Sequence, residues 1–162
     1  MNPHQVERLY HSVAVLLQDG RVACLGGDAR VDATLSIPYS GDTLEIFSPP
    51  QLFKDPRPAV LSFPSQAMQY GQAFPPFTVR STVNLAAGGK VTLIRAASVT
   101  HHFDSGARWV RLEATITQTV ANQFQVTVVP PPSGDYAPPG WYLLFVVTSN
   151  GTPSLGKWVQ VL

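Results

Sequence analysis

The stretch WVRLEATI, residues 109–116, decides the fold class of this chain. Its odd positions hold Trp, Arg, Glu and Thr, whereas its even positions hold Val, Leu, Ala and Ile. A period of two is the pattern of a strand with one face on a core and the other face in water. Such strands are typical of antiparallel sheets, because parallel strands are usually buried on both faces.

Similar short runs lie on both sides of this stretch, separated by residues that favour turns. The runs are TLEIF (43–47), AVLSF (59–63), FTVRSTV (77–83), KVTLIRA (90–96), FQVTVV (124–129), WYLLFVVT (141–148) and KWVQVL (157–162). Proline, glycine and asparagine punctuate the chain between them, as in PPPSG at residues 130–134. Several short strands at this spacing predict an all-β, immunoglobulin-like β-sandwich.

A β-hairpin is expected ahead of the sandwich. Two apolar runs, SVAVLL (12–17) and RVACL (21–25), flank an Asp19-Gly20 turn, which is a strong hairpin signal. Residues 28–42 carry no clear period and read as a loop, so we expect residues 1–42 to hold the hairpin and a linker and residues 43–162 to form the sandwich. Because both faces of the hairpin are apolar and an isolated hairpin is marginal in water, we expect it to need a partner.

The composition excludes several classes of protein. The 162 residues include 11 Lys+Arg and 10 Asp+Glu, a net charge of +1, so no basic field attracts nucleic acid. The single Cys24 allows neither an internal disulfide nor a zinc cluster and reads as a small buried hydrophobe. No signal peptide is visible, and the longest apolar run, 141–147, is shorter than the about 20 residues of a membrane span. The glycosylation sequon at 150–152 reads better as an Asn-Gly turn.

The histidines are the candidate functional residues. Tyr10 and His11 are adjacent at the start of the hairpin, and His101 and His102 follow the strand at 90–96. Imidazole is a common ligand of copper and similar ions, but spacing alone favours a structural or surface role. Adjacent residues of an ideal strand point to opposite faces, so Tyr10 and His11 can share a metal only at an irregular strand end. His102 reads as a solvated side chain and His4 as part of a flexible terminus.

Four stretches resemble the galactose oxidase and glyoxal oxidase family. Arg8-Leu9-Tyr10-His11-Ser12, with the hairpin after it, resembles the final kelch-type repeat of that family. Residues 47–53, FSPPQLF, resemble the start of its C-terminal early set domain. Ser98-Val99-Thr100-His101 resembles its histidine loop, and residues 139–146, PGWYLLFV, resemble its closing hairpin. The stretches occur in order over nearly the whole chain.

The resemblance implies a copper radical oxidase, which oxidises a primary alcohol or an aldehyde and reduces dioxygen to hydrogen peroxide. By motif match, Tyr10 is the axial copper ligand, which takes the hydroxyl proton of the substrate. His11 and His101 are the two equatorial copper ligands. Neutral imidazoles suit Cu(II) in a tetragonal plane, and a nearby tyrosinate can act as a base.

The pattern is incomplete in three respects. In the family a second tyrosine, joined to a cysteine, carries the radical, and both residues lie in a propeller upstream of the kelch repeat. No stretch of this sequence resembles that part of the propeller. Cys24 does not match the place of that cysteine, and Ala107-Arg108 stands where the family usually has Gln-Arg. We therefore expect the chain to contribute copper ligands but to be inactive alone, with either an upstream propeller chain or self-association through the N-terminal hairpin supplying the partner surface.

The alternative is a non-catalytic sandwich that acts in packing, carbohydrate contact or protein contact, or a fragment without activity. Trp109, Trp141 and Trp158 read as core or sheet-face residues rather than as a sugar platform. By resemblance the protein is extracellular, although its start carries no export signal.

Overall fold

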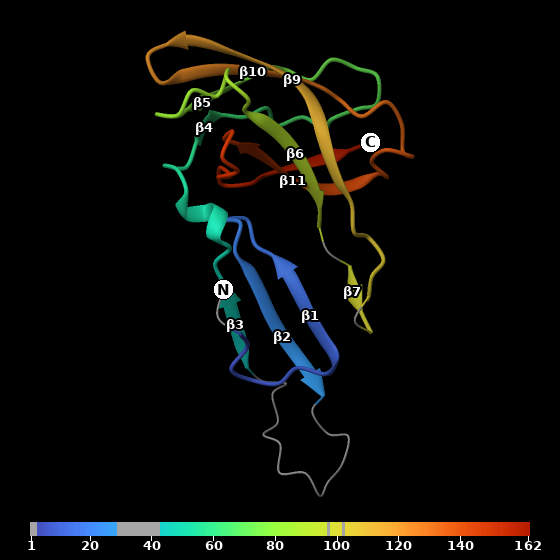
Figure 1. Cartoon of the computed structure of the whole chain (residues 1–162). Coiled ribbons are helices and arrows are strands. Elements are labelled where there is room, and N and C mark those ends of the chain that lie inside the picture. The colour runs from blue at the N-terminus through green and yellow to red at the C-terminus, as the bar shows by residue number, and fades with distance from the viewer. Residues whose placement is uncertain (1–2, 29–42, 97, 102) are drawn as a thin grey trace, which may run out of the picture. The chain divides into compact units, whose positions relative to one another are not determined.

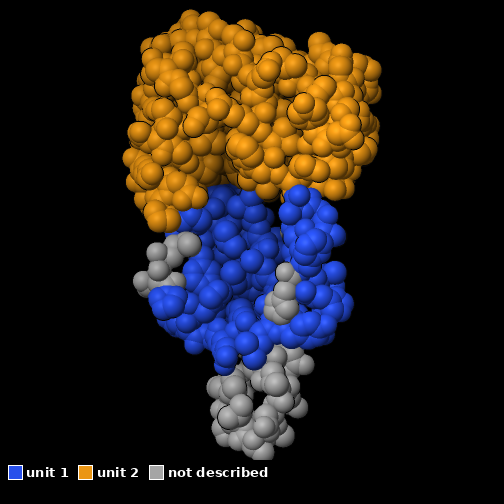
Figure 2. All heavy atoms as spheres, turned by 45° about the vertical axis from the view of Figure 1, so that its right-hand side comes forward, with its two compact units in different colours: residues 1–49, 97–107 blue, residues 50–96, 108–162 orange. Residues whose placement is uncertain are grey.

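The computed structural model describes residues 3–28, 43–96, 98–101 and 103–162. The chain divides into two compact units, coloured separately in Figure 2. Unit 1 comprises Met1–Pro49 and Ala97–Ala107, and unit 2 comprises Pro50–Ala96 and Arg108–Leu162. Apart from one 3-10 helix, η1 (Pro50–Phe53), the regular structure of the described residues is β-strand, as expected. In the same residues no helix has the length and apolar character needed to cross a membrane. The expected loop at 28–42, except for Asp28, and His102 lie outside the described residues.

Unit 1 is built on a three-stranded antiparallel sheet in the order β1-β2-β3 (Figure 1). Its strands are β1 (Tyr10–Leu16), β2 (Val22–Asp28) and β3 (Leu44–Phe47), and a second, small hairpin pairs β7 (Val99–Thr100) with β8 (Phe103–Asp104). The expected first hairpin is confirmed, with Leu16 opposite Val22 at its closed end. Gly20 adopts a φ of 82° in the turn, a conformation that glycine accepts at little cost.

The third strand of this sheet differs from the expected domain division. Residues 43–47 read as the first strand of the sandwich, but β3 pairs with β2, from Val22 opposite Phe47 to Leu25 opposite Leu44. The division between the units falls at Pro49 and Pro50 rather than near residue 42, and residues 97–107 group with unit 1. Pairing with β3 gives β2 a partner on its second edge, which leaves fewer unpaired backbone groups.

Unit 2 contains one continuous sheet that folds into two layers at a long strand, β9. The strand order is β12-β11-β6-β9-β10-β5-β4. The strands are β4 (Ala59–Ser62), β5 (Phe77–Arg80), β6 (Lys90–Arg95), β9 (Trp109–Val120), β10 (Gln123–Val129), β11 (Gly140–Val147) and β12 (Lys157–Val161). The first part of β9 pairs with β6 up to Leu112, and from Glu113 onwards it pairs with β10. One strand thus belongs to both layers of the sandwich, as Figure 1 shows.

Alternating side chains of the two layers form the core of unit 2. On β10, Phe124, Val126 and Val128 are buried, and the intervening side chains are exposed. They join one hydrophobic cluster with residues of β5, β6, β11 and β12, in which Tyr142 and Leu144 have no exposed surface. The three tryptophans lie on strands with their side chains largely exposed, between 48% and 62%. The tryptophans were expected in the core or on a sheet face, and the structure places them on a sheet face.

A polar clasp ties the start of unit 2 to its last turn. Asp55 accepts hydrogen bonds from Thr148 Oγ1 at 2.6 Å and from Asn150 Nδ2 at 3.0 Å. Thr152 is fully buried and donates from Oγ1 to the Gln51 carbonyl at 2.8 Å. Because the side chains of the sequon are engaged in this way, the turn interpretation of residues 150–152 is favoured. The hydrogen bond from Thr148 lowers the pKa of Asp55 most, and the bond from Asn150 lowers it further.

Substitution of a buried and of an exposed leucine tests the placement of the sandwich core. Leu144→Ala removes a side chain with no exposed surface, whereas Leu155→Ala removes one that is 56% exposed. We expect Leu144→Ala to lower the free energy of unfolding by about 2–5 kcal/mol and Leu155→Ala to change it by less than about 0.5 kcal/mol. Chemical denaturation of both variants measures the difference. Equal effects would contradict the placement of Leu144 in the core.

The clasp makes a prediction about pH. Because the pKa of Asp55 is lower in the folded chain than its ordinary value of 3.8, its carboxylate stabilises the fold above that value. The stabilisation is lost as the pH falls through the lowered pKa. Thermal unfolding of the wild type and of Asp55→Asn should therefore differ at neutral pH and converge in strong acid. Asp135→Asn, in an exposed loop, is the control; a gap between wild type and Asp55→Asn that persists in acid would be evidence against the clasp.

Candidate metal centre

Three aromatic rings named by the sequence analysis come together in unit 1. The ring centroids of Tyr10 and His11 lie 3.9 Å apart, and those of His11 and His101 lie 5.1 Å apart. The centroids of Tyr10 and His101 lie 5.7 Å apart. All three side chains are exposed, Tyr10 to 49%. Residues separated by 90 positions in the sequence therefore form one accessible cluster, which we call the Tyr-His-His cluster.

A left-handed residue explains how two adjacent side chains lie side by side. His11 has a φ of 64°, so Tyr10 and His11 escape the alternation of an ideal strand. A hydrogen bond from the Ser12 N–H to the Leu9 carbonyl, 3.2 Å long, closes the turn. A non-glycine residue in this region costs about 1–3 kcal/mol, and such strain is common at functional sites. The irregular strand end that the sequence analysis required is present.

Two glycines of β2 make room for this turn. A Cβ on Gly26 would lie 2.9 Å from the His11 carbonyl oxygen. A Cβ on Gly27 would lie 3.2 Å from the Arg8 Cα and 3.3 Å from the Leu9 nitrogen. Both glycines also have positive φ, 67° and 108°. The Gly-Gly pair is therefore needed for close backbone approach as well as for its conformation.

His101 is held at the tip of the hairpin formed by β7 and β8. It too is left-handed, with a φ of 51°, and its Nδ1 lies 2.7 Å from Thr100 Oγ1. Asp104 Oδ1 accepts hydrogen bonds from the N–H groups of Ser98 and Gly106, at 3.1 Å and 3.0 Å. With Nδ1 engaged, Nε2 is the nitrogen that His101 would offer to a metal, and the hydroxyl would fix the ring orientation.

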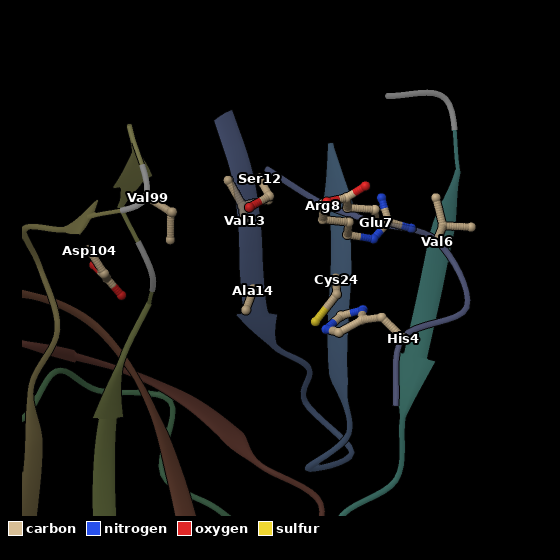
Figure 3. A pocket seen from close by; sticks show the side chains of 10 residues that line it. All are labelled: His4, Val6, Glu7, Arg8, Ser12, Val13, Ala14, Cys24, Val99 and Asp104. Carbon is tan, nitrogen blue, oxygen red and sulfur yellow. The ribbon is translucent and has the colours of Figure 1, made fainter. Parts of the chain in front are cut away.

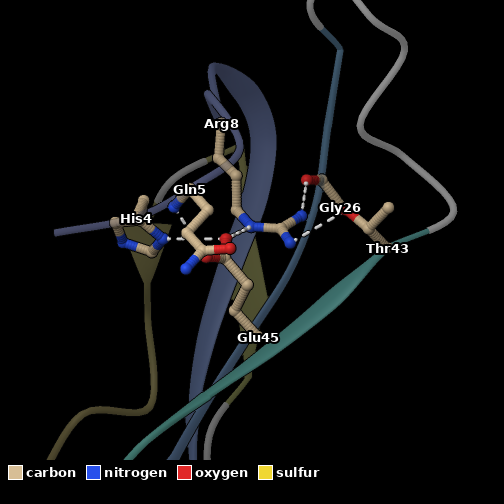
Figure 4. A network of polar contacts seen from close by, with 6 residues as sticks. All are labelled: His4, Gln5, Arg8, Gly26, Thr43 and Glu45. Atoms are coloured by element: carbon tan, nitrogen blue, oxygen red, sulfur yellow. Dashed lines mark hydrogen bonds and ion pairs between the residues drawn. The ribbon is translucent and has the colours of Figure 1, made fainter. Parts of the chain in front are cut away.

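A polar network beside the turn was not expected from the sequence. Figure 4 shows the Arg8 guanidinium bonded to Gly26, Thr43 and Glu45, with its Nε 3.2 Å from Glu45 Oε2. Glu45 also accepts from the backbone N–H of Gln5 at 2.8 Å and lies 3.2 Å from His4 Nδ1. The hydrogen bond from the Gln5 N–H lowers the pKa of Glu45 most, and the bonds to His4 and Arg8 lower it further. The expectation that His4 belongs to a flexible terminus without a partner is thus wrong: its ring also packs on Phe47, with centroids 4.6 Å apart.

A cavity of about 550 Å³ lies next to the cluster within unit 1. Figure 3 shows side chains of β1 and β2 on one side and Val99 and Asp104 on the other. Ser12, which follows His11, is also part of its wall. Cys24 lines the cavity, yet it is buried, and burial raises the pKa of its thiol. The expectation of a small buried hydrophobe at Cys24 is confirmed.

The donor set of the cluster suits a copper ion. In the described part of the chain no three His, Cys, Asp or Glu side chains gather to hold a metal, so the Tyr10 phenol is what gives the cluster a third donor. Metal–imidazole bonds are about 2.0–2.1 Å long, so two rings on one ion have centroids at most about 6 Å apart. The separation of His11 and His101 meets this limit. Two imidazoles and one phenol fit Cu(II) and leave at least one position for a further ligand.

Comparisons with known proteins identify the family of the chain. The family model for the galactose oxidase-like early set domain matches residues 57–161. The chain is 34% identical to the aldehyde oxidase GLOX of Vitis pseudoreticulata, over 100% of the chain and 31% of the relative. It is 30% identical to a galactose oxidase of Gibberella zeae, over 99% of the chain and 22% of the relative.

A solved structure shares the fold of the chain. A fungal alcohol oxidase of the AA5 family, in complex with copper, superposes with a TM-score of 0.73 at 26% identity, covering 99% of this chain and 32% of that one. The chain thus spans about a third or less of the length of these proteins. Within that span it belongs to the galactose oxidase-like family, and residues 57–161, which include His101, form its early set domain.

Proposed function

We propose that this chain supplies three ligands of the copper centre of a copper radical oxidase. The whole enzyme would oxidise a primary alcohol or an aldehyde and transfer two electrons and two protons to dioxygen, giving hydrogen peroxide. The observation that carries the proposal is the convergence of Tyr10, His11 and His101, two of them in left-handed conformations. Copper in the related solved alcohol oxidase supports it.

Each residue of the cluster has a distinct role in this proposal. His11 and His101 would hold the ion through their imidazole nitrogens, with His101 oriented by Thr100. When bound, copper supplies Lewis acidity and takes up one electron. The Tyr10 oxygen accepts the hydroxyl proton of the substrate, as a base positioned at the reacting atom. The exposure of Tyr10 leaves its ring accessible for this contact.

A second redox group is needed, because a two-electron oxidation exceeds what one copper ion takes up. The only cysteine, Cys24, is buried in β2 and lines the cavity. The missing ligand would therefore come from a further part of the enzyme, in keeping with the chain's share of its relatives. The partner we propose is an upstream propeller, on the same or another chain. An extracellular location remains a prediction from the resemblance.

An aliphatic face of unit 1 supports the need for a partner. Leu25 and Leu44 are opposite one another across β2 and β3, and Ile46 follows on the same face. These side chains are 37%, 56% and 45% exposed. Contiguous exposed apolar side chains commonly mark an interface. Self-association of the chain through this face is the other arrangement that would cover it.

Copper titration tests the proposed ligands. Wild-type chain should bind one Cu(II), and His101→Ala should weaken binding strongly because it removes one of two imidazoles. Tyr10→Phe should change the visible absorption of the complex, since it removes the phenolate donor. His4→Ala is the matched control, because His4 bonds to Glu45 in the same unit and lies outside the cluster. Unaltered binding in His101→Ala would favour the non-catalytic alternative.

A peroxide assay tests the need for a second redox group. Copper-loaded chain is expected to form no hydrogen peroxide with galactose, glyoxal or methylglyoxal, because it lacks the radical ligand. The intact galactose oxidase of Gibberella zeae serves as the positive control for the assay. Sustained peroxide formation by the purified chain would overturn the proposal that the site is incomplete.

A further inference from the structure

Arg8 is a buried cation whose guanidinium donates to Glu45, Gly26 and Thr43 in unit 1. Its side chain is only 4% exposed. Nε donates to Glu45 Oε2 at 3.2 Å, Nη1 to the Gly26 carbonyl at 2.9 Å, and Nη2 to Thr43 Oγ1 at 3.0 Å. A planar guanidinium suits this role because it presents several donors in fixed directions. Arg8 precedes β1, so these contacts connect the segment before β1 with β2 and with the start of β3.

The backbone of Arg8 is fixed at the same place as its side chain. A Cβ added to Gly27 would lie only 3.2 Å from the Arg8 Cα, so the two backbones are in close contact. The Arg8 guanidinium donates to the carbonyl of the neighbouring Gly26. At the other end of the turn, Ser12 is paired with Gly26 in the strand ladder. The turn from Leu9 to Ser12 is therefore anchored at both ends on the Gly-Gly pair.

The two residues between these anchors are Tyr10 and His11. A left-handed conformation at His11 persists only where the surroundings determine it. Arg8 lies immediately ahead of this turn, and neither Glu45 nor Thr43 belongs to the Tyr-His-His cluster. The side chain thus acts on the cluster through the backbone rather than by touching a metal or a substrate.

We propose that Arg8 is a positioning residue of the metal centre, which holds the Leu9–Ser12 turn so that Tyr10 and His11 face the same ion. The proposal rests on the proposed function for its copper readout. It also makes a claim about the metal-free chain, namely that the ring cluster itself depends on Arg8. The two claims can be tested separately.

The first experiment uses the metal-free chain. Nuclear Overhauser effects between the rings of Tyr10 and His11 and between His11 and His101 should be present in the wild type and weakened in Arg8→Met. Arg21→Met is the control, because Arg21 forms an ion pair with Asp19 in the turn of the same hairpin. Unchanged ring contacts in folded Arg8→Met would overturn the positioning role, whatever the chain does with copper.

The second experiment measures copper. We expect Arg8→Met to weaken Cu(II) binding by about 10-fold to 100-fold, the usual effect of losing a residue that orients a ligand, and to alter the Cu(II) electron paramagnetic resonance spectrum. Arg8→Lys keeps the charge but lacks the fork of donors, so its affinity should be intermediate. Wild-type affinity and spectrum in both variants would overturn the proposal. Absence of copper binding in the wild type, with ring contacts that still depend on Arg8, would instead refute the proposed function alone.

A glycine substitution covers the case in which Arg8→Met does not fold. Gly27→Ala leaves Arg8 in place but adds a methyl group against its Cα. Gly71→Ala is the control, since Gly71 also has a positive φ, 66° against 108° at Gly27, and has no atom within 4 Å of an added Cβ. Gly27→Ala should disturb the ring contacts and the copper spectrum, and Gly71→Ala should leave both unchanged. Identical behaviour of the two variants would contradict the anchoring of the turn.

Discussion

The left-handed conformation of His11 against Gly26 and Gly27 is the constraint on which the candidate site depends. In a regular strand, Tyr10 and His11 would lie on opposite faces of the sheet. The turn brings their rings to 3.9 Å of one another, and only glycines allow the opposing strand to approach so closely. Strain at the backbone is therefore what makes two consecutive donors usable by one ion.

Different interactions stabilise the two units. Unit 2 has a continuous apolar core that both layers of its folded sheet share. Unit 1 has a small sheet with an exposed aliphatic face, and its other face carries the buried Arg8 and its polar partners. The ion pair of Arg8 and Glu45 is partly buried, and losing one partner would leave the other charge uncompensated, so this network favours one arrangement of the strands.

Much of the fold could be predicted from local sequence, and the site could be predicted only in part. Alternation in residues 109–116 and the Asp19-Gly20 turn are local signals, and the structure confirms both. The pairing of β3 with β2 could not be predicted, because a four-residue strand carries no information on its partner. The same holds for Arg8 and Glu45, which are 37 residues apart. The convergence of His101 with Tyr10 and His11 followed from the family resemblance, since spacing alone favoured unrelated roles.

The proposed copper centre requires that His11 and His101 bind the same ion. Pulsed electron paramagnetic resonance on the Cu(II)-loaded chain counts the imidazoles coupled to the metal. Two coupled imidazoles are expected in the wild type and one in His11→Ala. A single coupled imidazole in the wild type, or a count that the substitution leaves unchanged, would contradict the proposed centre.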